Sequence, residues 1–184
     1  MNIAPSVQVN ILSRSGQTDS AIISKAEQKD MPRNWQCEWG QLFQNTDELY
    51  YESLVKIECQ GSLLGLMKYA LYPDAPEQVE FLEINNLEAL PQAQRQVDPV
   101  GRWLIWYACN IAINYCPQEP SSQILFLNSV EQAFAFYEDK IRMEYIEPVT
   151  LAPGEDGYAF RFNRRKAEQF CKQQEVTYGC PVVL

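Results

Sequence analysis

The fold of this chain is decided by residues 124–147, which read ILFLNSVEQAFAFYEDKIRMEYIE. The first four residues are all apolar, as is typical of a strand that is buried on both faces. Ser129 and Gln132 then have the spacing of a capping box, which favours the start of a helix. That helix would carry one apolar face, formed by Val130, Phe134, Tyr137 and Ile141. The segment therefore predicts a buried strand followed directly by an amphipathic helix.

The clearest helix of the sequence precedes this segment, at residues 100–115. Its apolar residues recur at alternating spacings of three and one, which is the pattern of a continuous helical stripe: Val100, Trp103, Leu104, Tyr107, Ala108, Ile111, Ala112 and Tyr115. Further apolar residues lie off the stripe, among them Ile105 and Trp106. We therefore expect this helix to be buried over much of its circumference and to end at Pro117.

The remaining segments predict a sheet in which most neighbouring strands are antiparallel. Extended patterns predict further strands at 7–11, 55–59, 63–71, 78–90, 143–149 and 158–162. Residues 18–43 have a mixed pattern, from which we expect one or two short helices with a break near Met31-Pro32. A polar helix is expected at 163–174. Because no repeat or linker interrupts the chain, residues 1–184 are expected to form a single domain of the α/β (α+β, mixed sheet) class.

The composition limits the chemistry of any site. The net charge of −9 argues against nucleic acid as a partner, because phosphate binding needs a basic surface. The chain contains no histidine, so acid–base chemistry falls to Glu, Asp, Tyr, Cys or Lys. Its six cysteines form no CxxC pair, so we expect no metal site and a reduced, cytoplasmic protein. We also expect no signal peptide and no membrane span.

Residues 124–147 resemble the GCN5-related N-acetyltransferase (GNAT) family, in which a buried strand, an Asn and a helix with an Ala-x-x-x-Tyr-Glu core follow one another. The matching residues are Asn128, Ala133, Tyr137, Glu138 and Ile141. The order of the predicted elements is also similar to that family over residues 55–162. The resemblance implies a GNAT-like acyl-CoA N-acyltransferase fold, with a central mixed, mostly antiparallel sheet, splayed fourth and fifth strands, and flanking helices.

Residues 87–102 are similar to the end of that family's fourth strand and to its pyrophosphate loop. The family pattern is Gln/Arg-x-x-Gly-x-Gly/Ala. Gln96 and Gly101 match its outer positions, and Pro99 stands where the first glycine belongs. The resemblance implies acetyl-CoA as the cosubstrate, and it implies the residues that would bind it: Leu87, Ala89, Gln96, Val100, Gly101, Arg102 and Asn128.

The residues themselves leave two interpretations of this loop open. Free backbone N–H groups and the positive end of the helix dipole would attract a diphosphate at Gly101. Pro99 has no N–H to donate, however, and Asp98 places a negative charge beside the expected diphosphate. The alternative is a loop that only begins the helix, with Pro99 near its first turn.

Two residues are candidates for acid–base catalysis. Glu83 lies in the predicted strand 78–90, where family members often carry a general base, and Glu80 and Glu88 are the next candidates. The alternative for Glu83 is an exposed strand glutamate. Tyr137 aligns with the tyrosine that protonates the departing CoA thiolate in many family members, a role that suits a phenol because its pKa exceeds that of a thiol. The alternative for Tyr137 is a core aromatic on the same stripe as Phe134.

The resemblance thus implies an enzyme that moves the acetyl group of acetyl-CoA to a primary amine by direct attack. The acceptor would be a small-molecule or peptide amine, and the sequence leaves open whether the protein is a monomer or a homodimer. The alternative, from another functional class, is a catalytically degenerate GNAT-fold protein that acts as a binding or regulatory module. Pro99, Asp98 and Arg142, which stands where a glycine usually follows the helix, favour that alternative.

Overall fold

A computed structural model describes residues 3–46, 51–73 and 78–184. Within these residues the backbone forms a ten-stranded sheet with the order β10-β1-β2-β3-β4-β5-β7-β9-β8, and β6 pairs with β1. β5 and β7 are parallel, and the other paired strands are antiparallel. The strands are β1 Val7–Ser13, β2 Thr18–Lys25, β3 Glu52–Cys59, β4 Ser62–Tyr72, β5 Phe81–Ala89, β6 Val97–Asp98, β7 Gln123–Val130, β8 Glu144–Ala152, β9 Glu155–Asn163 and β10 Val182–Val183.

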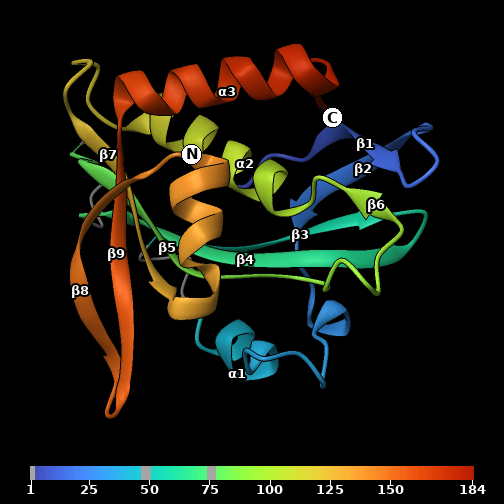
Figure 1. Cartoon of the computed structure of the whole chain (residues 1–184), viewed down its shortest axis with the longest axis horizontal. Coiled ribbons are helices and arrows are strands. Elements are labelled where there is room, and N and C mark those ends of the chain that lie inside the picture. Colours follow the sequence, from blue (N-terminus) through green and yellow to red (C-terminus); the bar gives the residue numbers. More distant parts are fainter. Residues whose placement is uncertain (1–2, 47–50, 74–77) are drawn as a thin grey trace.

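Helices cover both faces of this sheet (Figure 1). α2 lies on one face with α3 outside it, and α1 lies on the other face. The helical segments are η1 Gln28–Asp30, α1 Trp39–Gln44, α2 Gly101–Tyr115, η3 Glu131–Ala133, the π-helix η4 Phe136–Ile141 and α3 Arg164–Tyr178. None of the helices in the described part of the chain is long and apolar enough to cross a membrane.

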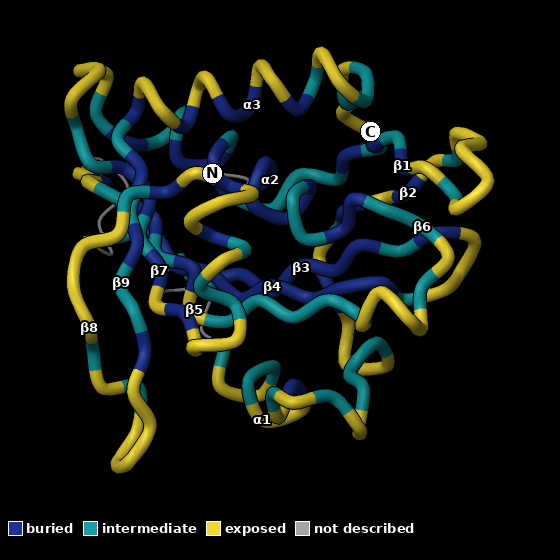
Figure 2. The backbone as a smooth tube through the Cα atoms, viewed as in Figure 1, coloured by how far each residue is buried: buried dark blue, intermediate teal, exposed yellow. Residues whose placement is uncertain are grey.

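The main core lies between the sheet and α2, and α2 is buried almost all round (Figure 2). This confirms the expectation from its apolar residues off the stripe. The indole N–H groups of its tryptophans form hydrogen bonds with neighbouring elements. Trp103 Nε1 donates to the Asn10 carbonyl of β1 at 2.7 Å, and Trp106 Nε1 donates to Glu175 of α3 at 2.9 Å. Burial without an unmet hydrogen bond explains why aromatic residues with polar atoms are tolerated here.

The last part of the chain encloses α2 and returns to the first strand. Arg164 is buried and donates to the carbonyls of Ile113 and Pro117, so it satisfies acceptors at the C-terminal end of α2. After α3, β10 pairs with β1 through Val7 and Val183. Asn10 Nδ2 also donates to the Tyr178 carbonyl at 2.8 Å. The first and last strands are therefore neighbours in the sheet.

The strand at the start of residues 18–43 was not expected from the sequence. Residues Thr18–Lys25 form β2, which pairs with β1 and β3. Ala21 and Ile23 are fully buried, whereas the residues between and beside them are more exposed. This is the period-two alternation of a strand, and only four residues separate β1 from β2. The short helices expected later in this segment are η1 and α1.

The capping box expected at Ser129 is wrong. Ser129 belongs to β7, where it pairs with Tyr158, and its hydroxyl donates to the Val130 carbonyl. The N-cap of the following turn is Val130, which makes no side-chain cap hydrogen bond. β9 pairs with β7 as far as Val130, so the strand continues through Ser129. The short local pattern does not reveal this long-range pairing. The helix then begins as a 3-10 turn and continues as the π-helix η4.

Arg142 ends η4 in the left-handed conformation, with φ of 65° and ψ of 38°. Its N–H donates to the Tyr137 carbonyl, as does the N–H of Met143 at 3.0 Å. An L side chain is disfavoured in this conformation, which explains why glycine is the usual residue at such a helix end. Arg142 therefore keeps a helix-ending geometry at a cost in backbone strain.

We expect Arg142→Gly to raise the free energy of unfolding by about 0.5–1 kcal/mol, because glycine adopts this conformation without a steric cost. Denaturation with urea measures the change. Asp139→Gly, within η4, is the matched control and should instead lower the free energy of unfolding by about 1 kcal/mol. An unchanged or lower stability for Arg142→Gly would show that the arginine side chain offsets the strain with contacts of its own.

Candidate functional site

The parallel pairing of β5 and β7 is short, and a cleft opens where it ends. Three residue pairs join the strands: Leu82 with Leu125, Glu83 with Phe126, and Ile84 with Leu127. β5 then continues to Ala89 along β4, whereas β7 continues to Val130 along β9. Beyond Ile84, the edge of β5 that faced β7 therefore has no strand beside it among the described residues. β5 and β7 are the splayed strands that the sequence resemblance implied.

Two adjoining cavities occupy this cleft. The inner cavity has a volume of about 510 Å³ and lies between the separating ends of β5 and β7, with Thr150 and Leu151 of β8 at its border. The outer cavity has a volume of about 520 Å³ and extends from there toward the N-terminus of α2. The residues that line both cavities are Leu87, Val130, Ala133 and Tyr137. The two cavities therefore meet at the Tyr137 side chain.

A β-bulge in β5 determines which side chains face the outer cavity. Ile84 pairs with Tyr69 and Asn86 pairs with Lys68, so Asn85 is an extra residue. Before the bulge, Leu82 and Ile84 pack into the core under α2; after it, Leu87 and Ala89 do so. Uninterrupted alternation would have placed Glu88 on that side instead. The Asn85-Asn86 pair, unusual within a strand, marks this irregularity in the sequence.

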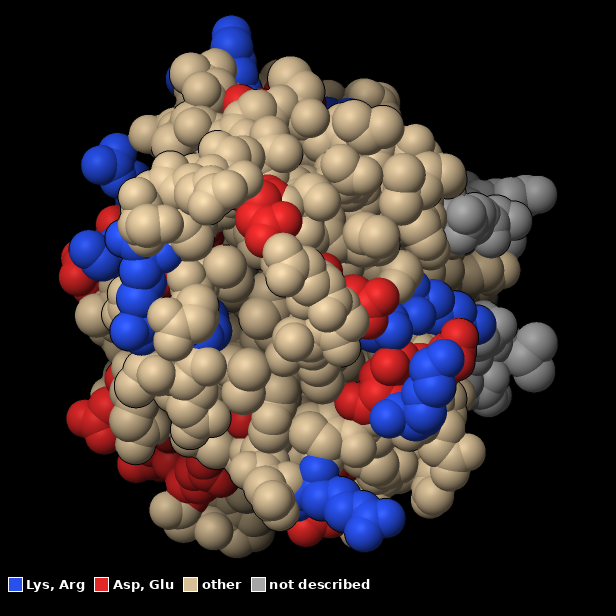
Figure 3. Space-filling view, turned by 90° about the vertical axis from the view of Figure 1, so that its right-hand side faces the viewer, with Lys and Arg blue, Asp and Glu red and all other residues tan. Residues whose placement is uncertain are grey.

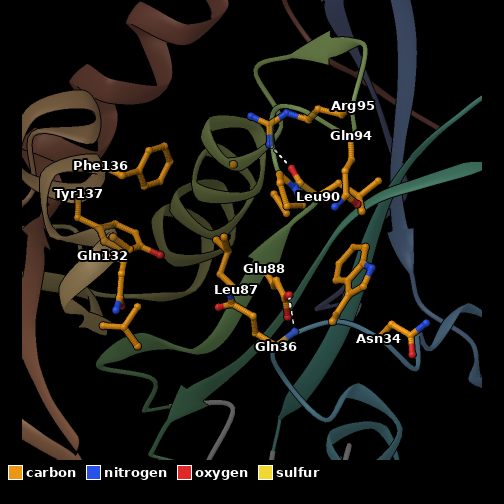
Figure 4. A pocket seen from close by; sticks show the side chains of 16 residues that line it. Asn34, Gln36, Leu87, Glu88, Leu90, Gln94, Arg95, Gln132, Phe136 and Tyr137 are labelled. Carbon is orange, nitrogen blue, oxygen red and sulfur yellow. Dashed lines mark hydrogen bonds between the residues drawn. The ribbon is translucent and has the colours of Figure 1, made fainter.

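Tyr137 extends from η4 into the cleft. Its side chain is 6% exposed, and its ring contacts those of Phe136 and Phe160, with centroids at 5.1 and 5.7 Å. Figure 4 shows its hydroxyl group pointing into the outer cavity. Among the described residues, that hydroxyl group has no hydrogen-bond partner. Burial, and secondarily the nearby Cys37, raise the pKa of Tyr137 well above its ordinary value, so the phenol stays protonated.

Glu88 holds the segment before α1 against the outer cavity. Its two carboxylate oxygens accept hydrogen bonds from the Gln36 N–H at 2.7 Å, the Cys37 N–H at 2.9 Å and Trp39 Nε1 at 2.9 Å. Figure 4 shows Gln36 and Glu88 at this wall of the cavity. Asn34, Trp35 and Gln36 line the outer cavity as a result. Glu88, a secondary candidate for the general base, thus anchors this segment through both carboxylate oxygens.

Cys37 lies at the border of the inner cavity, where Asn86 Nδ2 approaches its sulfur at 4.0 Å. Burial raises the pKa of its thiol to about 11, and Glu88 adds to the shift. The side chain is therefore a neutral thiol near pH 7. A covalent acyl-enzyme would need the thiolate, so Cys37 is poorly suited to nucleophilic catalysis.

The loop before α2 carries its own charge compensation. Arg95 lines the outer cavity and forms an ion pair with Asp98 at 2.6 Å, and it also donates to the Leu90 carbonyl. Figure 3 shows the side of the molecule at the right of Figure 1, where β6 lies; there, Lys and Arg side chains lie beside Asp and Glu side chains. The negative charge of Asp98 is thus balanced by a neighbouring guanidinium.

Gly101 begins α2 at the end of the outer cavity. A Cβ atom at this position would lie 3.0 Å from the Phe136 ring, so a larger residue here would force the ring to shift by a few tenths of an ångström. The N–H groups of Gly101 and Arg102 stand in the first turn, where a helix has no internal acceptors for them. Gly101 therefore combines close packing with free backbone donors.

Glu83 lies outside these two cavities, on the other face of β5. Its neighbours Leu82 and Ile84 are buried toward α2, so alternation directs Glu83 away from them. It is half-buried and lines a third cavity, of about 250 Å³, with Phe81 and Phe126. Burial raises the pKa of its carboxyl group above the ordinary value.

The structure brings some of the residues implied by the resemblance together and separates others. Leu87, Ala89, Gly101 and Tyr137 line the outer cavity, and Asn128 lines the inner and the third cavities. Three other residues lie elsewhere. Gln96 is exposed, Val100 is fully buried, and Arg102 extends to Gln174 of α3 at 2.9 Å and over the Phe170 ring at 5.1 Å.

Sequence reasoning missed the wall of the outer cavity formed by Asn34, Trp35 and Gln36. This segment is about fifty residues from Glu88 in the chain, and its contacts depend on the bulge that turns Glu88 toward it. No local pattern reveals such a contact. Phe136 was missed for a different reason, because it lies off the apolar stripe that contains Tyr137.

The sequence matches no protein-family model and no curated protein. Solved structures are nevertheless similar. An uncharacterised protein (bh2621) from Bacillus halodurans aligns with a TM-score of 0.58 and 14% identity, over 92% of this chain and 97% of that chain. The ribosomal-protein-S18-alanine N-acetyltransferase of Escherichia coli aligns with a TM-score of 0.54 and 16% identity, over 78% of this chain and 93% of that chain.

A third similar structure contains a ligand. Arabidopsis thaliana Naa50, solved in complex with the bisubstrate analogue CoA-Ac-MVNAL, aligns with a TM-score of 0.56 and 12% identity, over 78% of this chain and 98% of that chain. Other similar structures are described as acetyltransferases of the GNAT family. The chain therefore has the fold of the GNAT acetyltransferases, as the resemblance in residues 124–147 implied.

We expect Glu88→Gln to loosen the segment before α1, because an amide offers one acceptor oxygen where the carboxylate offers two. At least one of the three N–H groups would lose its partner, which lowers the free energy of unfolding by about 1–3 kcal/mol. Hydrogen exchange at the Gln36 and Cys37 amides should accelerate. Glu80→Gln, at an exposed residue, is the control. Unchanged exchange at both amides would contradict the role given to Glu88.

Proposed function

We propose that this protein is an acetyl-CoA-dependent N-acetyltransferase that moves the acetyl group to a primary amine by direct attack. The observation that carries the proposal is the cleft between β5 and β7, with the unpaired Tyr137 hydroxyl group at the junction of its two cavities. A protonated phenol in a cleft lined by a free strand edge suits the release of a thiol from an extended thioester.

The free edge of β5 would hold the pantetheine arm. Beyond Ile84 the backbone groups of β5 on the cleft side have no strand to pair with, so they can exchange hydrogen bonds with the amides of an extended ligand. Leu87 and Ala89 provide an apolar surface on the same stretch. The binding mode resembles the addition of a strand to an open sheet edge.

The N-terminus of α2 would hold the diphosphate. The N–H groups of Gly101 and Arg102 and the helix dipole supply attraction, and the Arg95 guanidinium lines the same cavity. Asp98 is paired with Arg95, which reduces the repulsion expected from its charge. The Phe136 ring packs against Gly101, so Phe136 is the side chain nearest to the proposed diphosphate position.

Tyr137 would act as the general acid. When the amine attacks the carbonyl carbon, the C–S bond breaks and a thiolate develops, and the phenol donates its proton to the sulfur. Because the pKa of Tyr137 is raised, the phenol keeps this proton until the thiolate develops. Cys37 would remain a neutral thiol beside it, which supports direct attack over a covalent acetyl-cysteine.

Glu83 would act as the general base. An amine reaches the enzyme mainly as an ammonium ion, and it must lose a proton to attack. Glu83 is half-buried, and its raised pKa makes its carboxylate a stronger base. It lies one residue before the end of the β5–β7 pairing, so the amine would approach the cleft from the third cavity.

Acetyl-CoA should raise the melting temperature of the protein, and Tyr137→Phe should lower kcat by about a hundredfold or more with little change in acetyl-CoA affinity. Thermal shift measures binding, and release of free thiol measures turnover. Tyr145→Phe, which removes an exposed hydroxyl group from β8, is the matched control. No stabilisation at millimolar acetyl-CoA would refute the enzyme. Binding without turnover of any amine would favour the alternative of a binding or regulatory module.

Glu83→Gln should remove the acidic limb of the pH profile of kcat. The base must be deprotonated, and its pKa is raised above 4.5, so activity in the unmodified protein falls as the pH drops through that raised value. The same shift has a cost in stability. The stabilising, protonated form is present below about pH 4.5 and is lost as the pH rises, so Glu83→Gln should raise the melting temperature near pH 7. An acidic limb that persists in the variant would assign it to another group.

A further inference from the structure

The third cavity has a composition suited to one kind of acceptor. It lies beside β5, β7 and β9, has a volume of about 250 Å³, and is lined by one carboxylate, one amide and five apolar residues. Ligand sites for drug-sized molecules have volumes of about 300–1,000 Å³. This cavity therefore suits a smaller group, and its chemistry is apolar with a single negative charge.

That charge belongs to Glu83, whose carboxylate has no hydrogen bond or ion pair among the described residues. Other partly buried charges in this sheet are paired: Lys56 with Asp30 and Glu58, and Lys68 with Glu52. A half-buried, unpaired carboxylate is unfavourable unless a ligand supplies the counter-charge. Glu83 is thus placed to receive one cationic group.

Aromatic rings form the wall next to that carboxylate. The Phe81 and Phe126 rings meet edge to face with centroids 5.1 Å apart, and Tyr72 stacks on Phe81 at 5.4 Å. Phe81 and Phe126 are only partly buried, so their surfaces remain available to a ligand. Aromatic rings bind apolar and aromatic groups, and they also attract cations.

The strand register sets the order of these groups along the cavity. Glu83 pairs with Phe126, and the separation of β5 from β7 begins one residue later. Phe81 lies two residues before Glu83, on the side away from the separation, whereas Asn128 lies two residues beyond Phe126, toward it. An amine at Glu83 would thus face the cleft, and the rest of the molecule would lie over the phenylalanines.

Resting on the proposed N-acetyltransferase function, we propose that the acceptor is a small primary amine with one positive charge, carried on an aromatic or compact apolar group. The ammonium group gives one proton to Glu83, and the neutral nitrogen attacks the thioester carbonyl carbon. The C–N bond forms and the C–S bond breaks, and the thiolate takes the proton of Tyr137. As the amide forms, the nitrogen loses its second proton, which returns through water to the Tyr137 phenolate, and Glu83 releases its proton to solvent. The products are an N-acetylated amine and the free thiol of CoA.

The same cavity disfavours other classes of amine. A polyamine would bring further positive charges, and Glu83 is the single carboxylate among the residues that line the cavity. An aminoglycoside would place hydroxyl groups against phenylalanine rings, where their hydrogen bonds with water are lost. A peptide N-terminus would place its continuing polar backbone beside the same phenylalanine rings.

The test compares kcat/KM for four acceptors with acetyl-CoA: 2-phenylethylamine, spermidine, an aminoglycoside and a short peptide with a free N-terminus. We expect 2-phenylethylamine to exceed each of the others by at least about tenfold. Phe126→Ala should lower its kcat/KM by about tenfold or more, mainly through KM. Phe126→Leu, which keeps much of the volume, should lose less. Phe43→Ala removes a half-buried phenylalanine from α1, outside the cavity, and should change kcat/KM by less than about twofold.

The outcomes separate the two proposals. Absence of acetyl-CoA binding refutes the N-acetyltransferase function, and the acceptor proposal with it. Acetyl-CoA binding together with preference for spermidine, the aminoglycoside or the peptide overturns only the acceptor class. Acetyl-CoA binding with no turnover of any of the four amines overturns both proposals. An equal effect of Phe126→Ala and Phe43→Ala also overturns it. Acetyl-CoA stabilisation of each variant, measured by thermal shift, shows that each one folds.

Discussion

The structure depends on one limit in its sheet: β5 and β7 pair at three positions and then separate. Each strand stays paired on its other side, β5 with β4 and β7 with β9, so the separation costs few backbone hydrogen bonds. It nevertheless leaves a free strand edge inside the molecule rather than at its border. The two adjoining cavities, the position of Tyr137 and the route to Glu83 all follow from where this pairing stops.

The groups around the cleft are held in place at some cost in stability. Within the described ranges, Tyr137 is buried with an unpaired hydroxyl group and Glu83 is half-buried without a counter-charge, and Arg142 ends η4 in a conformation that favours glycine. The opposite holds in the core beside them, where α2 is enclosed by the sheet and α3 and its aromatic polar atoms are paired. Such a division is expected where binding groups are kept ready on a rigid scaffold.

Much of this arrangement could be predicted from local patterns, and the exceptions have physical causes. The stripe of α2 and the apolar run of β7 were sufficient because burial alone determines both. β2 was missed because its alternation is carried by just two fully buried residues, Ala21 and Ile23, within a polar segment. The sequence at Ser129 is typical of a helix cap, but pairing with Tyr158 of β9 keeps this residue in β7. In the site, Tyr137 and Gly101 belong to contiguous motifs and line the outer cavity, whereas Trp35 reaches the cavity through the contact of Glu88 with a distant segment.

The pairing of β1 with β10 has a consequence for how the molecule is made. The ribosome releases β1 early, yet the part of its edge that pairs with β10 stays open until residues 182–183 emerge. The Asn10 side chain likewise cannot form its hydrogen bond until the carbonyl of Tyr178, 168 positions away in the chain, has been made. Contacts over such separations slow folding, because a long loop must close before they form. Val7 and Gln8 therefore lack this strand partner until β10 has been made, whereas β6 can pair with the other end of the same edge much earlier.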